Sequence, residues 1–267
     1  KQNYTMPCNW GKHDGMEVGR GGSLQPYRFT NLDDLNRRMM SIAYQVATRD
    51  VLDLPPETDV VREVTLEPDV ARLYRKLERD LTAEIREGRV TASNALVKLL
   101  RLQEITGGSV HDEKGDLQRV STAKIEELKE WLDELPSAEE PAVVFCRFHA
   151  DLDAVHLATG GSSLELSGRV NELDAWLAGD APILAVQMQA GSLGIELHRA
   201  AYACFYSLGF SLTDYLQARG RLVRPDQTRP VHFTHLVAHG TVDQEVYAAL
   251  ERREEVIARV LRTRFWH

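Results

Sequence analysis

The chain has 267 residues, of which 43% are hydrophobic and 27% charged, and this composition is typical of a globular protein whose core is stable without disulfides. Its net charge of −8 excludes a polycation that coats nucleic acid, so any contact with nucleic acid must be local. No apolar run approaches the roughly 18 residues that a membrane span needs, and we expect no membrane partner.

The three cysteines, Cys8, Cys146 and Cys204, are odd in number and far apart in the sequence. This pattern argues against a disulfide framework and against a zinc site, and we predict no metal ligand in the chain. We therefore expect a reducing compartment, which is the cytoplasm, or the nucleus if the protein is eukaryotic. Because the chain begins at Lys1 within polar, glycine-rich sequence, we also expect a fragment of a longer protein.

The first part of the chain is expected to precede the main domain. Residues 1–30 are glycine-rich without periodicity, which predicts an irregular segment. Residues 31–106 begin with helical spacing of apolar residues and continue, after a Pro-Pro break, with an alternating strand pattern over 60–66. Two amphipathic helices follow at 68–86 and 92–105, with nearly balanced charges, and they predict a small helical protrusion.

Residues 107–267 open with a polar loop or hairpin and then alternate between strand and helix patterns. Short buried strands separated by helices predict an α/β fold with a mostly parallel sheet and helices on both faces. In such sheets ligands bind at the C-terminal ends of the strands, which points to the loops after Cys146, Val186 and Tyr206. The expected strands are 142–146, 182–186, 202–206 and 231–237, and the expected helices are 122–135, 150–158, 171–179, 212–222 and 242–261.

The run DYLQARGRLVRPDQT, residues 214–228, places three arginines and two glutamines around a proline. If its first part is helical, Gln217 and Arg221 share one face and Arg224 follows three residues later. Pro225 disfavours helix at the preceding residue, so both arginines should stand at a helix end. Planar guanidinium groups suit the oxygens of a transferring phosphoryl group, although the spacing also fits a solvated helix with surface arginines.

Two further loops are candidates for phosphate binding. In VQMQAGSLGIEL, Gly191 and Gly194 would let the backbone approach a ligand and Ser192 adds a hydroxyl, although a tight strand-to-helix turn explains the glycines equally well. In FCRFHADLD, Arg147 and His149 leave a strand just before a helix N-terminus, a place suited to phosphate. A surface arginine with local partners is the alternative for this second loop.

The sequence QARGRLVRPDQ resembles motif VI of superfamily-two helicases, in the form Q-A-x-[DG]-R-x-x-R-x-G-Q of the Swi/Snf-type double-stranded-DNA translocases. The matching residues are Gln217, Ala218, Arg221, Arg224 and Gln227. We call residues 217–227 the motif VI segment.

Other stretches resemble the same family in the same order. QMQAGSLGIEL is similar to motif V, Q-x-x-A-G-G-x-G-x-N-L, and we call residues 187–197 the motif V segment. AVVFCRFHADLDAV resembles motif IV, VLDLPPET resembles the element that precedes the second lobe, and HLVAHGTVDQEV the closing strand and helix. The resemblance covers most of the chain, and its compact insertions favour a bacterial or viral origin.

The chain departs from the family pattern at four positions. In the motif V segment, Ser192 stands where the family commonly has a second glycine, and Glu196 stands where asparagine is usual. In the motif VI segment, Val223 stands where histidine is frequent, and Asp226 stands where glycine is typical. A carboxylate at Glu196 would repel phosphate, which leaves its role in motif V open.

The sequence contains no G-x-x-x-x-G-K-[ST] and no acidic D-E-x-x box after a buried strand, so the phosphate-cradling lysine and the Mg²⁺-binding carboxylate of a complete motor are missing. The resemblance places both in a first RecA-like lobe, expected upstream of Lys1. It implies that this chain is the C-terminal RecA-like lobe, inactive by itself, of a motor whose ATP and Mg²⁺ are bound mainly by the missing lobe.

The resemblance also assigns roles to residues. Arg224 would be an arginine finger on the γ-phosphate, Arg221 its partner and Gln217 an orienting group. The ATP or interlobe side would include Gly191, Gly194, Glu196 and Gln227. Contacts to the duplex DNA backbone, which carry no base information, would come from Arg147, His149, Ser167, Gly168, Gln187 and Ser192. Two alternatives stay open, namely the C-terminal lobe of an RNA helicase and a non-catalytic DNA-binding or regulatory module.

Overall fold

The structure is a computed structural model that describes residues 16–18, 24–26, 34, 37–39, 41–42, 53–86, 92–111, 115–189 and 195–262. The chain divides into two compact units, one of them Leu52–Leu250 and the other formed by Lys1–Val51 with Glu251–His267. The three-part division expected from the sequence remains a prediction about domains.

The described part of Lys1–Val51 contains an antiparallel pair of strands, β1 (Met16–Val18) and β2 (Leu24–Pro26). This short ladder lies within the segment expected to be irregular, because three-residue strands are too short to give a periodic pattern. Asp34 and residues 37–39 are helical, in agreement with the expected lead-in helix, and Arg38 Nε donates to Asp34 Oδ2 at 3.0 Å.

The unit Leu52–Leu250 is built on a six-stranded sheet in the order β3-β10-β9-β6-β8-β7, in which every neighbouring pair is parallel. The strands are β3 (Glu57–Val64), β6 (Ala142–Cys146), β7 (Leu164–Leu166), β8 (Ile183–Gln187), β9 (Tyr202–Phe205) and β10 (Val231–Ala238). The helices around it are α5 (Ala123–Asp133), α6 (His149–Ala158), α7 (Leu173–Ala178) and α8 (Leu212–Arg219), together with the part of α9 (Val242–Arg262) that ends at Leu250. The predicted α/β fold is confirmed, and none of the described helices combines the length and hydrophobicity that a bilayer crossing requires.

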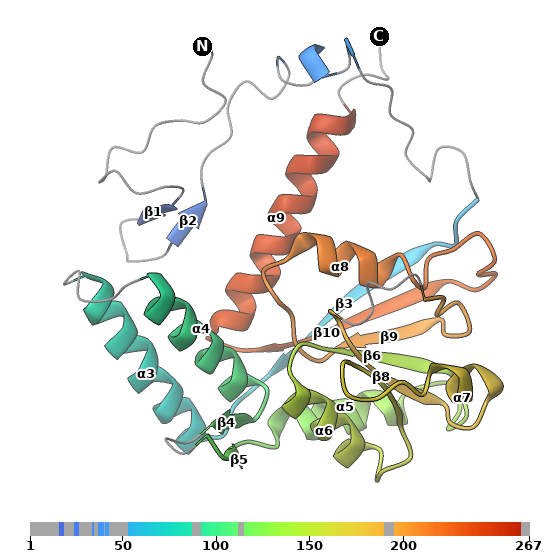
Figure 1. Cartoon of the computed structure of the whole chain (residues 1–267), viewed down its shortest axis with the longest axis horizontal. Helices are drawn as coiled ribbons and strands as arrows, with labels where there is room; N and C mark the ends of the chain where they lie inside the picture. Colours follow the sequence, from blue (N-terminus) through green and yellow to red (C-terminus); the bar gives the residue numbers. More distant parts are fainter. Residues whose placement is uncertain are drawn as a thin grey trace. The chain divides into compact units, whose positions relative to one another are not determined.

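The core is divided by the sheet into two layers. Along β6, Val143 and Phe145 pack with residues of α8 and the beginning of α9, whereas Val144 and Cys146 pack with α5 and α6 on the opposite face (Figure 1). Successive side chains of a strand point to opposite faces, so a strand covered on both faces reads as a continuous apolar run. This explains why AVVFC and its neighbours could be recognised as strands from the sequence.

The helical protrusion consists of α3 (Pro68–Arg86) and α4 (Ala92–Thr106), followed by the hairpin of β4 (Ser109–His111) and β5 (Leu117–Arg119). The Gln103 side chain on α4 donates to Leu208 O at 3.0 Å. On α3, the Tyr74 hydroxyl accepts from the Val242 N–H at the start of α9, at 2.7 Å. Both helices of the protrusion are therefore fixed to the sheet unit by hydrogen bonds.

A buried ion pair joins three of these elements. Lys124 of α5, whose side chain is 1% exposed, donates to Asp243 Oδ2 of α9 at 2.6 Å and to Tyr206 O at 2.9 Å. The other carboxylate oxygen of Asp243 accepts from the Thr106 hydroxyl of α4 at 2.8 Å. A buried ammonium group requires such a complete set of partners.

Replacing Asp243 by asparagine should destabilise the chain strongly, because it leaves the Lys124 ammonium buried without a counter-charge. We expect Asp243→Asn to lower the free energy of unfolding in urea by about 3 kcal/mol. The matched control is Glu126→Gln, which removes the partner of the exposed Lys129 and should change stability by less than about 0.5 kcal/mol. Equal effects of the two substitutions would contradict this role for the buried pair.

Candidate functional site

The arginine run begins in α8. The Ser211 side chain caps this helix by accepting from the Asp214 N–H at 3.3 Å. The helix ends at Arg219 rather than at the expected residue 222, but helical-turn hydrogen bonds continue as far as the Val223 N–H, which donates to Arg219 O at 3.1 Å. The chain leaves helical geometry before Pro225, as the proline predicts.

Arg219 has a structural role that the sequence did not indicate. Its Nη2 donates to Glu57 Oε2 at 2.7 Å and to Asp59 Oδ2 at 2.9 Å, and its guanidinium lies 4.1 Å from the Phe233 ring centroid. Burial lowers the pKa of Arg219, but the hydrogen bonds to the two carboxylates outweigh it and raise the pKa above its ordinary value. Arg219 therefore fixes α8 to β3, and its partner Asp59 lies 160 positions away in the sequence.

Arg221 and Arg224 are half-buried and have different surroundings from Arg219. The carbonyl of Arg221 accepts from the Leu197 N–H at 3.1 Å, which joins the motif VI segment to the end of the motif V segment. Arg224 Nη2 lies 3.9 Å from Glu196 Oε1, and these side chains are 35% and 58% exposed. Such a pair is a weak one in solvent, so Arg224 can exchange Glu196 for another anion.

Gln227 connects the motif VI segment to the residues that directly follow the motif V segment. Its side chain is buried, and Nε2 donates to His198 O and to Ala200 O, each at 2.9 Å. Its Oε1 accepts from the Arg229 N–H at 3.0 Å. Gln227 was expected on the ATP or interlobe side, but its side-chain amide forms these hydrogen bonds within the lobe. Gln217, in contrast, is exposed on α8.

Arg221 and Arg224 lie at the edge of the sheet where the strands begin. Because all six strands are parallel, the strand ends share one edge and the strand starts share the other. The segment with Arg221 and Arg224 leads into β10, and residues 196–200 lead into β9, so both belong to the edge of strand starts. The arginines reach this edge because α8 carries the chain back from the end of β9 to the start of β10. The general rule for parallel sheets had instead pointed to the loops that follow Cys146, Val186 and Tyr206.

Most of the residues predicted to contact DNA do lie at the edge of strand ends. They follow or end the neighbouring strands β6, β8 and β7, and Gln187 Oε1 accepts from the Gly168 N–H at 3.2 Å. His149 is exposed at the start of α6. We call this set the strand-end set, consisting of Arg147, His149, Ser167, Gly168 and Gln187. The remaining glycine-rich residues Gly191, Ser192 and Gly194 lie outside the described residues, and their roles stay predictions.

Arg147 is held in place by the helical protrusion. Its Nη1 donates to Gln103 Oε1 at 2.6 Å, and its guanidinium lies 5.2 Å from the Phe148 ring centroid. Burial lowers the pKa of Arg147 below its ordinary value. The negative charges of Asp151 and Asp214 act in the opposite direction but do not outweigh burial. A guanidinium has five N–H donors, so the contact with Gln103 leaves donors for an anion.

The turn at Ser167 is organised by a buried carboxylate. Glu165, with a side chain 4% exposed, accepts from Arg169 Nε at 2.8 Å, contacts His156 Nε2 at 3.0 Å and accepts from the Ser167 hydroxyl. Burial would raise the pKa of Glu165, but the hydrogen bonds from Arg169, Ser167 and His156 lower it to about 2. The N–H groups of Arg169 and Val170 in turn donate to Ser167 Oγ at 3.1 and 3.2 Å, which fixes the turn beside Gly168.

Comparison with known proteins shows which chains this one is similar to. Residues 123–226 match the family described as helicase conserved C-terminal domain. A protein of Caenorhabditis elegans is 28% identical to this chain over 144 residues, which are 50% of this chain and 15% of that protein. Its name is SWI/SNF-related matrix-associated actin-dependent regulator of chromatin subfamily A containing DEAD/H box 1 homolog. A crystal structure of the C-terminal part of the Fun30 ATPase domain matches with a TM-score of 0.58 at 18% identity, over 74% of this chain and 90% of that one. The chain contains a Swi/Snf-type C-terminal helicase lobe.

Two further matches concern the extent of this Swi/Snf-type lobe. Protein p41 of Acyrthosiphon pisum secondary endosymbiont phage 1 is 24% identical over 257 residues, which are 93% of this chain and 54% of that protein. The Sulfolobus solfataricus SWI2/SNF2 ATPase core domain matches with a TM-score of 0.56 at 18% identity, over 85% of this chain and 50% of that chain. The chain thus spans about half the length of each of these two proteins.

Two residues near the candidate sites of the Swi/Snf-type lobe were not found from the sequence. Gln103 orients Arg147 from a helix of the protrusion, and no local signal in the sequence connects them. His198 lies beside Glu196 and Asp226 in space. Its position two residues after Glu196, directly behind the motif V segment, is the signal that could have identified it.

The lowered pKa of Glu165 predicts a specific dependence of stability on pH. A carboxylate with a depressed folded-state pKa contributes stability above its unfolded value near 4.5, and this contribution is lost as the pH falls toward 2. We expect Glu165→Gln to destabilise the chain at pH 7, and the difference from wild type to shrink between about pH 4.5 and 2. Urea unfolding at several pH values measures it, with the exposed Glu130→Gln as control. A difference independent of pH would contradict the assigned interactions.

Proposed function

We propose that this lobe is the second half of an ATP-dependent double-stranded-DNA translocase. Its first partner would be an N-terminal RecA-like lobe of the same protein, which holds ATP and Mg²⁺ with residues that this chain lacks. The placement of Arg221 and Arg224 carries the proposal, because both are half-exposed in the turn that follows α8. Arg221 is joined through its carbonyl to Leu197 at the end of the motif V segment, and the Arg224 side chain lies 3.9 Å from Glu196 of that segment. The match of the chain to half of an SWI2/SNF2 ATPase core domain supports a missing lobe.

The arginine chemistry follows from charge and shape. A transferring γ-phosphoryl group spreads negative charge over its oxygens, and a planar guanidinium can donate two parallel hydrogen bonds to them. Arg224 would supply these bonds as the arginine finger, with Arg221 as a second cation and Gln217 orienting them. The weak contact of Arg224 with Glu196, at 3.9 Å, would be exchanged for phosphate when the two lobes close.

The second partner would be duplex DNA, bound by the strand-end set. The guanidinium of Arg147 and the exposed imidazole of His149 can donate to phosphate oxygens, and such contacts position a protein without reading bases. The net charge of −8 makes this contact local, so we expect few ionic contacts and a shallow dependence on salt. Nucleotide and DNA would thus bind at opposite edges of one sheet.

We expect Arg224→Ala to lower duplex-stimulated phosphate release by a factor on the order of 10³ or more. The assay uses the polypeptide extended upstream to its natural start, with and without duplex DNA, beside the 267-residue chain alone. Arg224→Lys should lower the rate of phosphate release similarly, because a point charge does not replace a bidentate donor. Replacement of the exposed Arg101 on α4 by alanine is the control, which should retain the wild-type rate.

Two outcomes would favour the alternatives. Stimulation by RNA in place of duplex DNA would indicate an RNA helicase lobe. No hydrolysis by the extended polypeptide, with duplex binding intact and tolerant of Arg224→Lys, would indicate a DNA-binding or regulatory module that uses the arginines as a phosphate clamp.

A further inference from the structure

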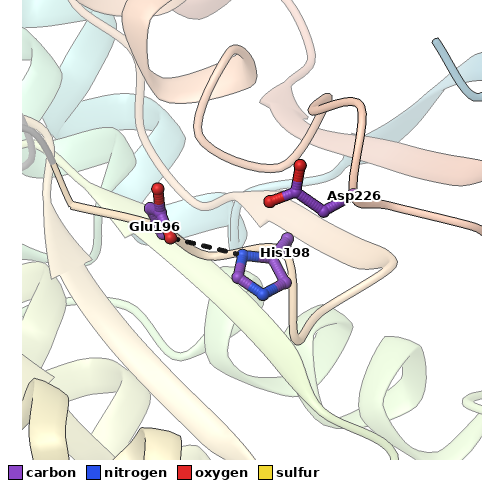
Figure 2. A group of neighbouring side chains, drawn as sticks. All are labelled: Glu196, His198 and Asp226. Atoms are coloured by element: carbon purple, nitrogen blue, oxygen red, sulfur yellow. Dashed lines mark ion pairs between the residues drawn. The ribbon is translucent and has the colours of Figure 1, made fainter. Parts of the chain in front are cut away.

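Three side chains with metal-binding donors converge at the edge of strand starts. Glu196, His198 and Asp226 each offer one ligand atom, and these atoms all lie within 4.8 Å of one another (Figure 2). We propose that they form a binding site for a divalent transition-metal ion of the zinc type. The sequence predicted no metal ligand, because Asp226 comes from a different segment of the chain than the other two residues.

The histidine provides an observation independent of the carboxylates. The Nδ1 atom of His198 is shielded from solvent, although the side chain as a whole is 38% exposed, and among the residues that the structure describes this atom has no hydrogen-bond partner. It lies 3.9 Å from Glu196 Oε2, which is too far for a hydrogen bond. Buried polar atoms of native proteins are rarely left unpaired, because they lose their bonds to water. An ion between the imidazole and the carboxylates would give this nitrogen the partner that it lacks.

The backbones that carry the three ligands are fixed relative to one another. Gln227, next to Asp226, donates from its side chain to the carbonyl of His198 at 2.9 Å. Leu197, between Glu196 and His198, donates its N–H to Arg221 O at 3.1 Å. The two segments that carry the ligands are therefore held in position before an ion binds.

The remaining adjustment is within reach of the side chains. Ligand atoms bound tetrahedrally to zinc at about 2.0–2.2 Å lie about 3.4 Å apart, so the three groups must approach by about 1 Å. The Glu196 side chain is 58% exposed and Asp226 is exposed as well, so both carboxylates can rotate toward the imidazole. One or more waters would complete the coordination.

The donor set selects the class of ion. One imidazole nitrogen and two carboxylates suit zinc and its transition-metal neighbours, whereas magnesium prefers oxygen ligands and retains its waters. Both carboxylates stand where the sequence departs from its family, at positions where the usual asparagine and glycine would not supply a charged ligand.

An ion at this site would also affect the surroundings of Arg224. Glu196 is the group that lies 3.9 Å from Arg224, so coordination of Glu196 would take this carboxylate away from the arginine. This consequence rests on the proposed function of Arg224, whereas the binding site itself does not.

Isothermal titration of the 267-residue chain with zinc chloride, without nucleotide or DNA, tests the site. We compare wild type with Glu196→Gln, Asp226→Asn and His198→Gln, and expect each variant to lose one equivalent of zinc or to bind it roughly 10-fold or more weakly. Magnesium at the same concentration should not compete. His239→Gln, which removes an exposed histidine 3.4 Å from Glu63, is the matched control and should bind like wild type.

Differences from wild type are decisive, because other histidines and cysteines can also bind zinc. Equal stoichiometry and affinity in wild type and the Glu196 and Asp226 variants would overturn the proposal, as would an equal loss in the His239 control. The two carboxylate variants preserve size at exposed positions, and their melting temperatures without metal establish that they fold. Zinc binding without ATP hydrolysis in the extended polypeptide would reject only the proposed function, and hydrolysis without zinc binding would reject only the metal site.

Discussion

The buried side chain of Gln227 connects the motif VI segment to residues 198–200, which directly follow the motif V segment. Its amide nitrogen donates to the carbonyls of His198 and Ala200, and its oxygen accepts from the Arg229 N–H. An unpaired amide at this depth would cost free energy, so these bonds favour one register between the segments. The position of Arg224 relative to Glu196 follows from that register, together with the backbone bond between Leu197 and Arg221.

The three arginines of one short run have different physical roles because they meet different partners. Arg219 is bound by two carboxylates and packed on Phe233, so it belongs to the framework. Arg221 and Arg224 retain exposed surface, and Arg224 has only the weak contact with Glu196 among its ion pairs in the described residues. An arginine that stabilises a fold and one that binds a ligand are distinguished here by desolvation and pairing rather than by position in a motif.

Much of the fold could be predicted because its strands are covered on both faces. AVVFC, PILAV and YACFY give continuous apolar runs, and the structure places each within one or two residues of the prediction. The strand β7 was not predicted, since it has three residues and a charged one, Glu165, in its centre. The buried carboxylate there is stabilised by Arg169 and His156, which are contacts that no pattern in the sequence reveals.

The candidate site could be predicted only in part. Motif spacing singled out Arg221, Arg224 and Gln227 as candidates, but the sequence did not indicate where they lie on the sheet. The return path of α8 places them at strand starts. The partnership of Arg147 with Gln103 and the meeting of His198 with Asp226 depend on tertiary packing of distant segments. Such contacts follow from topology, which local periodicity does not specify.

The most direct test of the account is movement along duplex DNA. The polypeptide with its natural upstream sequence would be incubated with ATP and a duplex that carries a triplex-forming third strand, and release of that strand would be followed over time. We predict ATP-dependent displacement by wild type, without separation of the duplex strands, and none by Arg224→Ala at equal DNA binding. Displacement that is unchanged in Arg224→Ala, or hydrolysis of ATP without any displacement, would contradict a translocase whose second lobe supplies the arginine finger.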